Sequence, residues 1–196
     1  MKTELSFDPT TETCRLETCE RLGYKLKVVD IPGLDAETSS NPDIDRFWGL
    51  KNGIEMLAPG PNVLILVTPV DRYNEENNFL VGSLSCLEGI SKYTIVIFTK
   101  VDTTKNPITR EMISKSETLR DLLALSEGRF QLFNNVNKDE QQVQNLMKMV
   151  KTFTDSKQKK FFDNSIFTPD SVQKLSEVVV ECEIKRKKAI ETYMQF

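Results

Sequence analysis

Short apolar runs alternate with helix-like patterns along most of the chain. Strongly apolar runs bounded by turn residues predict buried strands at residues 62–69, 93–99 and 129–134. Apolar positions at helical spacing predict helices at residues 74–90, 109–126 and 138–153. Because strands and helices alternate, we expect an α/β fold with a parallel sheet and helices on both of its faces.

The region before residue 60 has a different pattern. Two β-prone runs, residues 12–20 and 25–31, are separated by a short connection containing Gly23, which predicts a hairpin. A polar stretch at residues 35–45 predicts a loop, and apolar residues at helical spacing predict a helix at 47–57. Beyond the last α/β unit, residues 170–196 predict one more helix, which contains a basic run at 185–188.

Composition narrows the classes of function. The chain has 196 residues, 39% hydrophobic and 28% charged, as in a soluble globular protein, and a net charge of −3 that argues against nucleic acid as a partner. It has no histidine, and its four cysteines form no metal-binding spacing. The longest apolar run, 63–67, is too short to span a bilayer, so we expect a cytoplasmic protein. The basic run predicts at most peripheral membrane contact, and a solvated helix face is the favoured explanation.

The first motif follows the second β-prone run, where Asp30 is separated from Gly33 by two residues. Such a DxxG turn suits a switch that senses a terminal phosphate, because the aspartate reaches a magnesium shell and the glycine N–H approaches the phosphate. An ordinary strand-to-turn transition gives the same pattern.

The second motif is Thr99-Lys100-Val101-Asp102, directly after a buried strand. The carboxylate of such a TKxD motif accepts hydrogen bonds from the ring N1–H and the exocyclic amine of guanine, a donor pair that adenine lacks. A third polar group, Asn134-Asn135, follows the last strand, where a guanine-nucleotide-binding domain places its final base-contacting loop. By itself this pattern indicates only a turn that contains asparagine. Ligands of open α/β sheets bind at these carboxyl ends of the strands.

The order of these motifs resembles Ras-like GTPases. The resemblance narrows at residues 58–76, APGPNVLILVTPVDRYNEE, to the immunity-associated GTPases, the GIMAP or IAN family with its AIG-type G domain. The same family pattern extends over roughly residues 10–155.

This resemblance implies a GTP- or GDP-binding switch with a P-loop NTPase-like fold. It implies that Thr11 and Asp30 contact Mg²⁺, that Gly33 forms the second switch, and that Thr99, Lys100, Asp102 and Asn135 bind the base. It also implies a homodimer through the nucleotide face. Leu34 stands where Ras-type GTPases carry a water-positioning glutamine, so we expect weak intrinsic hydrolysis and assign no catalytic residue.

A P-loop of the form GxxxxGK[ST] is not found in residues 1–27. We therefore expect the three-layer sheet to lack its first strand and P-loop, which puts GTP and Mg²⁺ binding in question. Three explanations stay open: the sequence is a fragment, the flanking strands pair directly, or another segment fills the gap.

Two functions follow from these observations. The first is a guanine-nucleotide-binding switch, with residues 1–158 as a truncated G domain and 159–196 as a helical extension. The alternative is a pseudo-GTPase that serves as an interaction or dimerisation module without binding nucleotide.

Overall fold

A computed structural model of the chain describes residues 13–31, 42–70, 81, 84–85, 87–102, 108–116, 119–137, 139–163 and 177. The chain divides into two compact units, of which the first comprises residues 1–60 and 164–196 and the second comprises residues 61–163. Each unit is described separately below.

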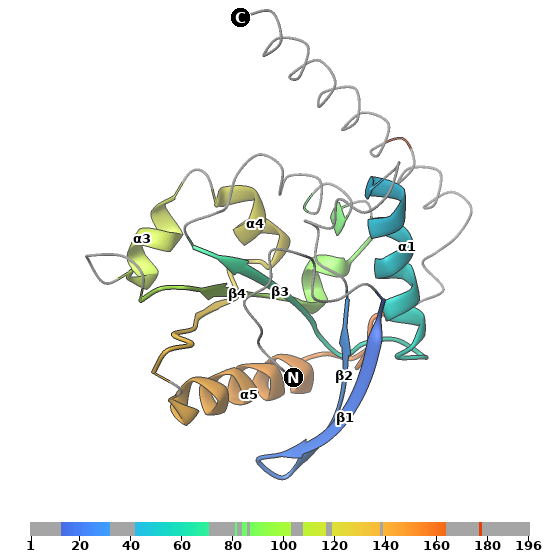
Figure 1. Ribbon diagram of the computed structural model, residues 1–196, viewed down its shortest axis with the longest axis horizontal. Coiled ribbons are helices and arrows are strands. Elements are labelled where there is room, and N and C mark those ends of the chain that lie inside the picture. Colours follow the sequence, from blue (N-terminus) through green and yellow to red (C-terminus); the bar gives the residue numbers. More distant parts are fainter. Residues whose placement is uncertain are drawn as a thin grey trace, which may run out of the picture. The chain divides into compact units, whose positions relative to one another are not determined.

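The first unit contains an antiparallel hairpin of β1 (Arg15–Arg21) and β2 (Tyr24–Asp30) (Figure 1). Its two-residue turn, Leu22-Gly23, has positive φ at both positions, 50° and 77°. This is the backbone shape that matches the twist of a two-stranded ribbon, and glycine adopts it without steric cost. The hairpin predicted from the sequence is therefore confirmed.

The helix α1 (Pro42–Glu55) also belongs to the first unit. It begins five residues earlier than predicted, so residues 42–45, predicted as part of a loop, are helical. Proline is well suited to a first helical turn, because its missing N–H has no partner there and its φ is already helical. Gly53 brings this helix against the end of β2, since a Cβ at that position would lie 2.7 Å from the Ile31 Cδ1 atom.

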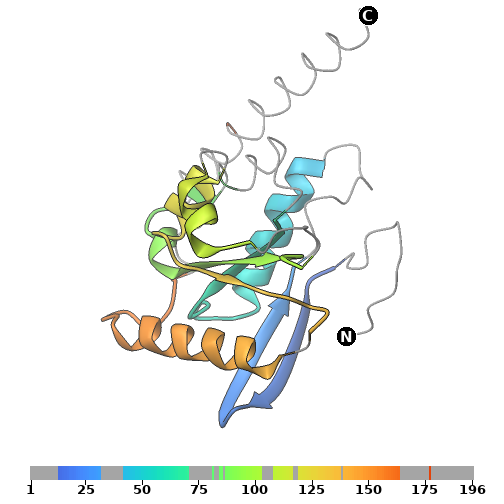
Figure 2. The ribbon, with the colours of Figure 1, turned by 90° about the vertical axis from the view of Figure 1, so that its left-hand side faces the viewer.

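The second unit is built on a parallel sheet with the strand order β3-β4-β5. Its elements are β3 (Leu64–Pro69), η2 (Ile90–Tyr93), β4 (Thr94–Thr99), α3 (Arg110–Lys115), α4 (Arg120–Leu125), β5 (Phe130–Leu132) and α5 (Glu140–Asp155). The helices α3 and α4 cover one face of this sheet and α5 lies on the other (Figures 1 and 2). The predicted α/β class is confirmed.

The core of the second unit surrounds β4. Every residue from Thr94 to Phe98 is buried, as expected for a central strand covered on both faces. On the face covered by α3 and α4, the rings of Phe98 and Phe130 meet edge to face, with their centroids 5.7 Å apart.

Two predicted helices require correction. The helix predicted at 109–126 is divided into α3 and α4, because Ser116 is extended (φ −71°, ψ 120°). The local sequence, Ser-Lys-Ser-Glu-Thr, is a weak helix former, since serine and threonine side chains compete for backbone hydrogen bonds. The helix predicted at 74–90 lies partly outside the described residues, and Gly89, with φ 77°, precedes the separate 3-10 helix η2.

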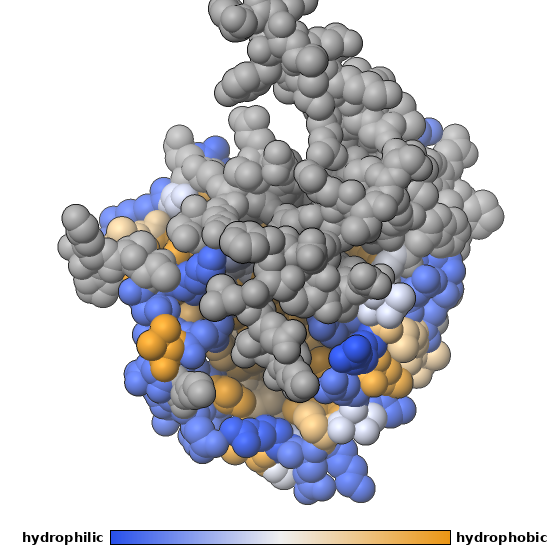
Figure 3. Space-filling model, in the orientation of Figure 1, coloured by the Kyte–Doolittle hydropathy of each residue, from blue (hydrophilic) through white to orange (hydrophobic). Residues whose placement is uncertain are grey.

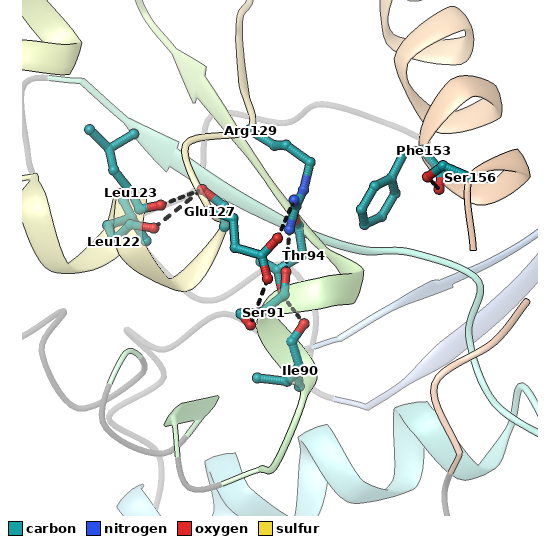
Figure 4. A network of polar contacts seen from close by, with 10 residues as sticks. Ile90, Ser91, Thr94, Leu122, Leu123, Glu127, Arg129, Phe153 and Ser156 are labelled. Atoms are coloured by element: carbon teal, nitrogen blue, oxygen red, sulfur yellow. Dashed lines mark hydrogen bonds and ion pairs between the residues drawn. The ribbon is translucent and has the colours of Figure 1, made fainter. Parts of the chain in front are cut away.

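Arg129 connects several of these elements. Its guanidinium donates to the backbone oxygens of Ser91 and Thr94, the latter at 3.2 Å, and pairs with Glu127 at 2.8 Å (Figure 4). The same guanidinium lies 4.4 Å from the centre of the Phe153 ring on α5. The hydrogen bond from Arg129 holds the pKa of the Glu127 carboxyl below its usual value. This network fixes the connection between α4 and β5.

The segment after α5 returns to the start of β3. The Phe162 N–H donates to the Pro61 oxygen at 2.8 Å, and the Asn62 side-chain amide donates to the Lys160 oxygen at 2.6 Å. The Phe162 ring is buried and meets Tyr93 edge to face at 5.4 Å. These contacts join the last residues of the second unit to its first residues.

Apolar side chains remain exposed on the edge strand β3. Ile65 is 43% exposed and Val67 is 64% exposed, whereas Leu64 on the other face is buried. Figure 3 shows apolar side chains interrupting the hydrophilic surface on the face that it displays. In the described parts of the chain, no helix is both long and apolar enough to cross a membrane.

Candidate functional site

The carboxyl ends of the three parallel strands meet at one edge of the sheet. Pro69 pairs in register with Thr99, and Phe98 pairs with Leu132. The ladders continue past the strand ends, since the Val70 N–H donates to the Thr99 oxygen at 3.0 Å and the Phe133 N–H donates to the Phe98 oxygen at 2.8 Å. The register therefore brings the segments after β4 and β5 to the same edge, where open α/β sheets bind ligands.

The segment after β4 carries the predicted base-binding motif. Thr99 is the last residue of β4 and is half-buried, Lys100 is half-buried, and Asp102 is exposed in the turn that follows. Lys100 has φ 57°, a left-handed conformation that costs a residue with a Cβ about 1–2 kcal/mol. Leu22 and Glu127 take the same conformation in turns, at φ 50° and 49°, whereas Lys100 takes it directly after the buried strand β4. Backbone strain of this kind is common at ligand-binding positions.

The segment after β5 forms a closed turn. The Asn134 side-chain oxygen accepts hydrogen bonds from the N–H groups of Val136 and Asn137, both at 2.9 Å. This is the local turn that asparagine side chains commonly form. Asn135 lies within this turn and is exposed. The two asparagines thus differ, because Asn134 holds the turn and Asn135 presents a side chain to solvent.

Sequence reasoning missed one residue of this region, Gln142 in the first turn of α5. Its side-chain oxygen accepts the Asn134 N–H at 2.6 Å, and its side-chain amide donates to the Asn134 oxygen at 3.0 Å. Nothing in the sequence marks this glutamine, since a polar residue in a first helical turn is usual.

The predicted phosphate-side residues belong to the first unit. Asp30 is the exposed last residue of β2 and pairs in register with Arg15. Burial raises the pKa of the nearby Cys14 thiol, and the Asp30 carboxylate acts in the same direction. The Cys14 thiol donates to the Gly49 oxygen of α1 at 3.1 Å, so it fixes α1 beside the start of β1.

Four of the seven predicted site residues, Thr99, Lys100, Asp102 and Asn135, lie at or just beyond the carboxyl ends of the neighbouring strands β4 and β5. Asp30 lies in the other unit, and Thr11 and Gly33 lie outside the described residues, as does Leu34. Within the described ranges, no three acidic or cysteine side chains gather as a metal ion would require. At this sheet edge the Asp102 carboxylate and the Asn135 side-chain amide are both exposed, and the oxygens of both can accept hydrogen bonds.

The chain is similar in sequence to one protein family and to curated proteins from several organisms. The AIG1 family profile matches residues 1–183. The human protein "GTPase IMAP family member 8" is 26% identical over 161 residues, which is 79% of this chain and 24% of that protein. The Arabidopsis thaliana protein "Immune-associated nucleotide-binding protein 9" is 30% identical over 171 residues, covering 80% of this chain and 48% of the relative. The chain thus spans about a quarter of the first relative and about half of the second.

Proposed function

Because this chain belongs to the AIG1 family, we propose that it binds guanine nucleotide at the carboxyl ends of β4 and β5 and acts as a nucleotide-dependent switch. The observation that supports this proposal is the left-handed Lys100 within Thr99–Asp102 at the end of β4, with the exposed Asn135 turn following the neighbouring strand β5 at the same sheet edge. The names of the two relatives, a GTPase and a nucleotide-binding protein, agree with it.

The proposed base recognition follows from hydrogen-bond chemistry. The Asp102 carboxylate accepts the ring N1–H and the exocyclic amine of guanine, the Lys100 stem packs along the base, and Thr99 supports the turn. Asn135 supplies a second polar contact from the β5 side. Adenine offers no matching donor pair, so it would leave the carboxylate unpaired.

The proposed phosphate side rests on Thr11, Asp30 and Gly33. Thr11 and Asp30 would hold Mg²⁺, whose charge offsets that of the phosphates when it is bound. The exposed carboxylate of Asp30 at the end of β2 is suited to such a ligand. Since the described residues form no acidic cluster, most of the metal's ligands would come from the phosphates, from Thr11 and from water.

The remaining proposals concern the whole protein. An apolar residue at Leu34 cannot orient a water molecule, so intrinsic hydrolysis would be weak. The switch would act as a homodimer through the nucleotide face in the cytoplasm. Residues 1–158 would form the G domain and 159–196 a helical extension.

A second candidate function is a protein-interaction module that binds no nucleotide. The exposed Ile65 and Val67 on the edge strand β3 favour it, because apolar residues on a sheet edge suit a protein partner.

Titration of residues 1–196 with fluorescent GDP, GTP and ADP in the presence of Mg²⁺ tests the proposal. We expect the guanine nucleotides to bind more tightly than ADP. Asp102→Ala removes the acceptor of two charge-assisted hydrogen bonds, so it should weaken GDP binding about 100-fold or more. Glu111→Ala removes a comparably exposed carboxylate on α3 and should leave binding unchanged.

Two results would count against the switch. Equal GDP affinity of Asp102→Ala and the unaltered chain would place the base elsewhere. If the unaltered chain binds no guanine nucleotide up to millimolar concentration, the interaction module is the better account.

A further inference from the structure

One side chain of α5 holds the turn that presents Asn135. Gln142 uses both ends of its side-chain amide on the same residue: its oxygen accepts the Asn134 N–H at 2.6 Å, and its NH₂ group donates to the Asn134 backbone oxygen at 3.0 Å. The side-chain amide thus bonds to both backbone polar groups of one residue, as a residue of a neighbouring strand would. The ladder to β4 ends at Phe133, so Gln142 continues the pairing one residue further.

Gln142 occupies a helix position whose side chain usually makes a different hydrogen bond. Asp139 caps the helix by accepting the Gln141 N–H at 2.9 Å, which makes Gln142 the third helical residue. A glutamine at this position commonly folds back onto the N–H of its own capping residue. Here the amide of Gln142 reaches out to Asn134 instead and keeps only a long contact, 3.4 Å, to the Asp139 oxygen.

The consequence concerns Asn135. The backbone on one side of it is fixed by Gln142, and the N–H groups on the other side, those of Val136 and Asn137, are fixed by the Asn134 side chain. Asn135 lies between these anchors and is exposed. The backbone on both sides of Asn135 is therefore held by Gln142 and by the Asn134 side chain.

We propose that Gln142 is a positioning residue for guanine recognition, which acts by holding the Asn134–Asn137 turn so that Asn135 is directed toward the base held by Asp102. This inference rests on the proposed function. Preorganisation of this kind increases affinity because the ligand no longer has to order the turn when it binds.

The test compares Gln142→Leu with Gln141→Leu in residues 1–196. Both substitutions replace a glutamine in the first turn of α5, but the Gln141 side chain is exposed and bonds only to Asn145 along the helix. GDP and ADP affinities with Mg²⁺ are measured for each variant, together with amide hydrogen exchange at Val136, at Asn137 and within α5. Gln142→Glu provides an intermediate case, since it keeps the acceptor for the Asn134 N–H and loses the donor to the Asn134 oxygen.

Gln142→Leu should weaken GDP binding about tenfold, by the loss of two hydrogen bonds, and leave ADP binding unchanged. Exchange at Val136 and Asn137 should accelerate while exchange within α5 stays the same. The GDP affinity of Gln142→Glu should lie between those of Gln142→Leu and the unaltered chain. The GDP affinity of Gln141→Leu should equal that of the unaltered chain. A purely structural role would lower stability without changing the preference for GDP over ADP.

The other outcomes separate the two proposals. If the unaltered chain binds GDP and Gln142→Leu binds it equally well, the role of Gln142 is refuted and the proposed function stands. If the unaltered chain binds no GDP, the proposed function and the inference both fail. If Gln142→Leu unfolds, Gln142→Glu decides, because a partial and selective loss of GDP affinity supports the inference and an unchanged affinity overturns it.

Discussion

At the scale of single residues, two side chains occupy environments that ordinary surface residues avoid. Lys100 takes a left-handed backbone conformation directly after a buried strand. Lys157, just beyond the end of α5, has its Nζ atom 3.4 Å from the centre of the Phe153 ring and 3.8 Å from that of Tyr93. This Nζ is enclosed, and among the residues that the structure describes it has no hydrogen-bond partner. Lys100 belongs to the proposed site, and Lys157 contributes to the packing of the second unit.

The environment of Lys157 leads to a pH-dependent prediction. Burial, with repulsion from Arg129, lowers the pKa of Lys157 from 10.5 to about 8, although Glu127 acts against this. Between these pH values the unfolded chain binds more protons than the folded chain does, so the contribution of Lys157 makes stability rise with pH from about 8 to 10.5. Below pH 8 the ammonium is charged in both states and its burial disfavours the folded state.

Lys157→Met should therefore stabilise the protein at pH 7 by about 0.5–1 kcal/mol, since the two rings partly offset the desolvation and partial exposure screens it. The advantage of the variant should shrink as the pH approaches 10.5. Urea unfolding of both proteins at pH 7, 8.5 and 10 measures this difference. An advantage that stays constant with pH would contradict the assignment of the shifted pKa to Lys157.

At the scale of elements, α5 matters because it carries both the packing surface for the sheet and the glutamine that holds the Asn134 turn. Its start is defined by Asp139, whose carboxylate accepts the Gln141 N–H at 2.9 Å. An acceptor at this position satisfies a helix N–H group that otherwise has no partner.

Asp139→Ala should lower the free energy of unfolding by about 1 kcal/mol, the usual cost of losing such a cap. Asp139→Asn should cost much less, because asparagine also caps helices well. Thermal and chemical unfolding of the two variants provide the comparison. Equal losses for both would show that the charge of Asp139, and not its hydrogen bond, stabilises α5.

The elements also show what can be predicted from the sequence. The strands β3 and β4 were predictable because their apolar runs are continuous, so the position of Thr99–Asp102 at the end of β4 was predictable too, while its role stays a prediction. The helix break at Ser116 and the hydrogen bonds from Gln142 to Asn134 were not predictable. Both depend on contacts between elements that the local sequence does not specify. The positions of Thr11 and Gly33 stay predictions.

At the scale of the molecule, the second unit has a well-buried central strand and an incompletely covered edge strand. Val96 on β4 is completely buried, whereas Val67 on β3 is 64% exposed. Exposed apolar side chains on an edge strand favour association with another chain.

Val67→Thr should change the free energy of unfolding by less than about 0.5 kcal/mol, as is usual for exposed positions, and should reduce self-association. Val96→Thr, which places a hydroxyl in the core, should cost about 1–3 kcal/mol. Urea unfolding and sedimentation equilibrium measure the two effects. A loss of stability in Val67→Thr as large as that in Val96→Thr would mean that Val67 is covered in solution.

The central claim is that guanine binds where β4 and β5 end. Amide NMR spectra of residues 1–196 during titration with GDP and Mg²⁺ test it most directly, because every backbone N–H at that edge reports separately. The account predicts that the signals of Lys100–Asp102 and Asn134–Asn137 shift with GDP and not with ADP. The claim would be contradicted if the signals of both segments stay in place when GDP is added. It would also be contradicted if GDP and ADP shift these signals equally.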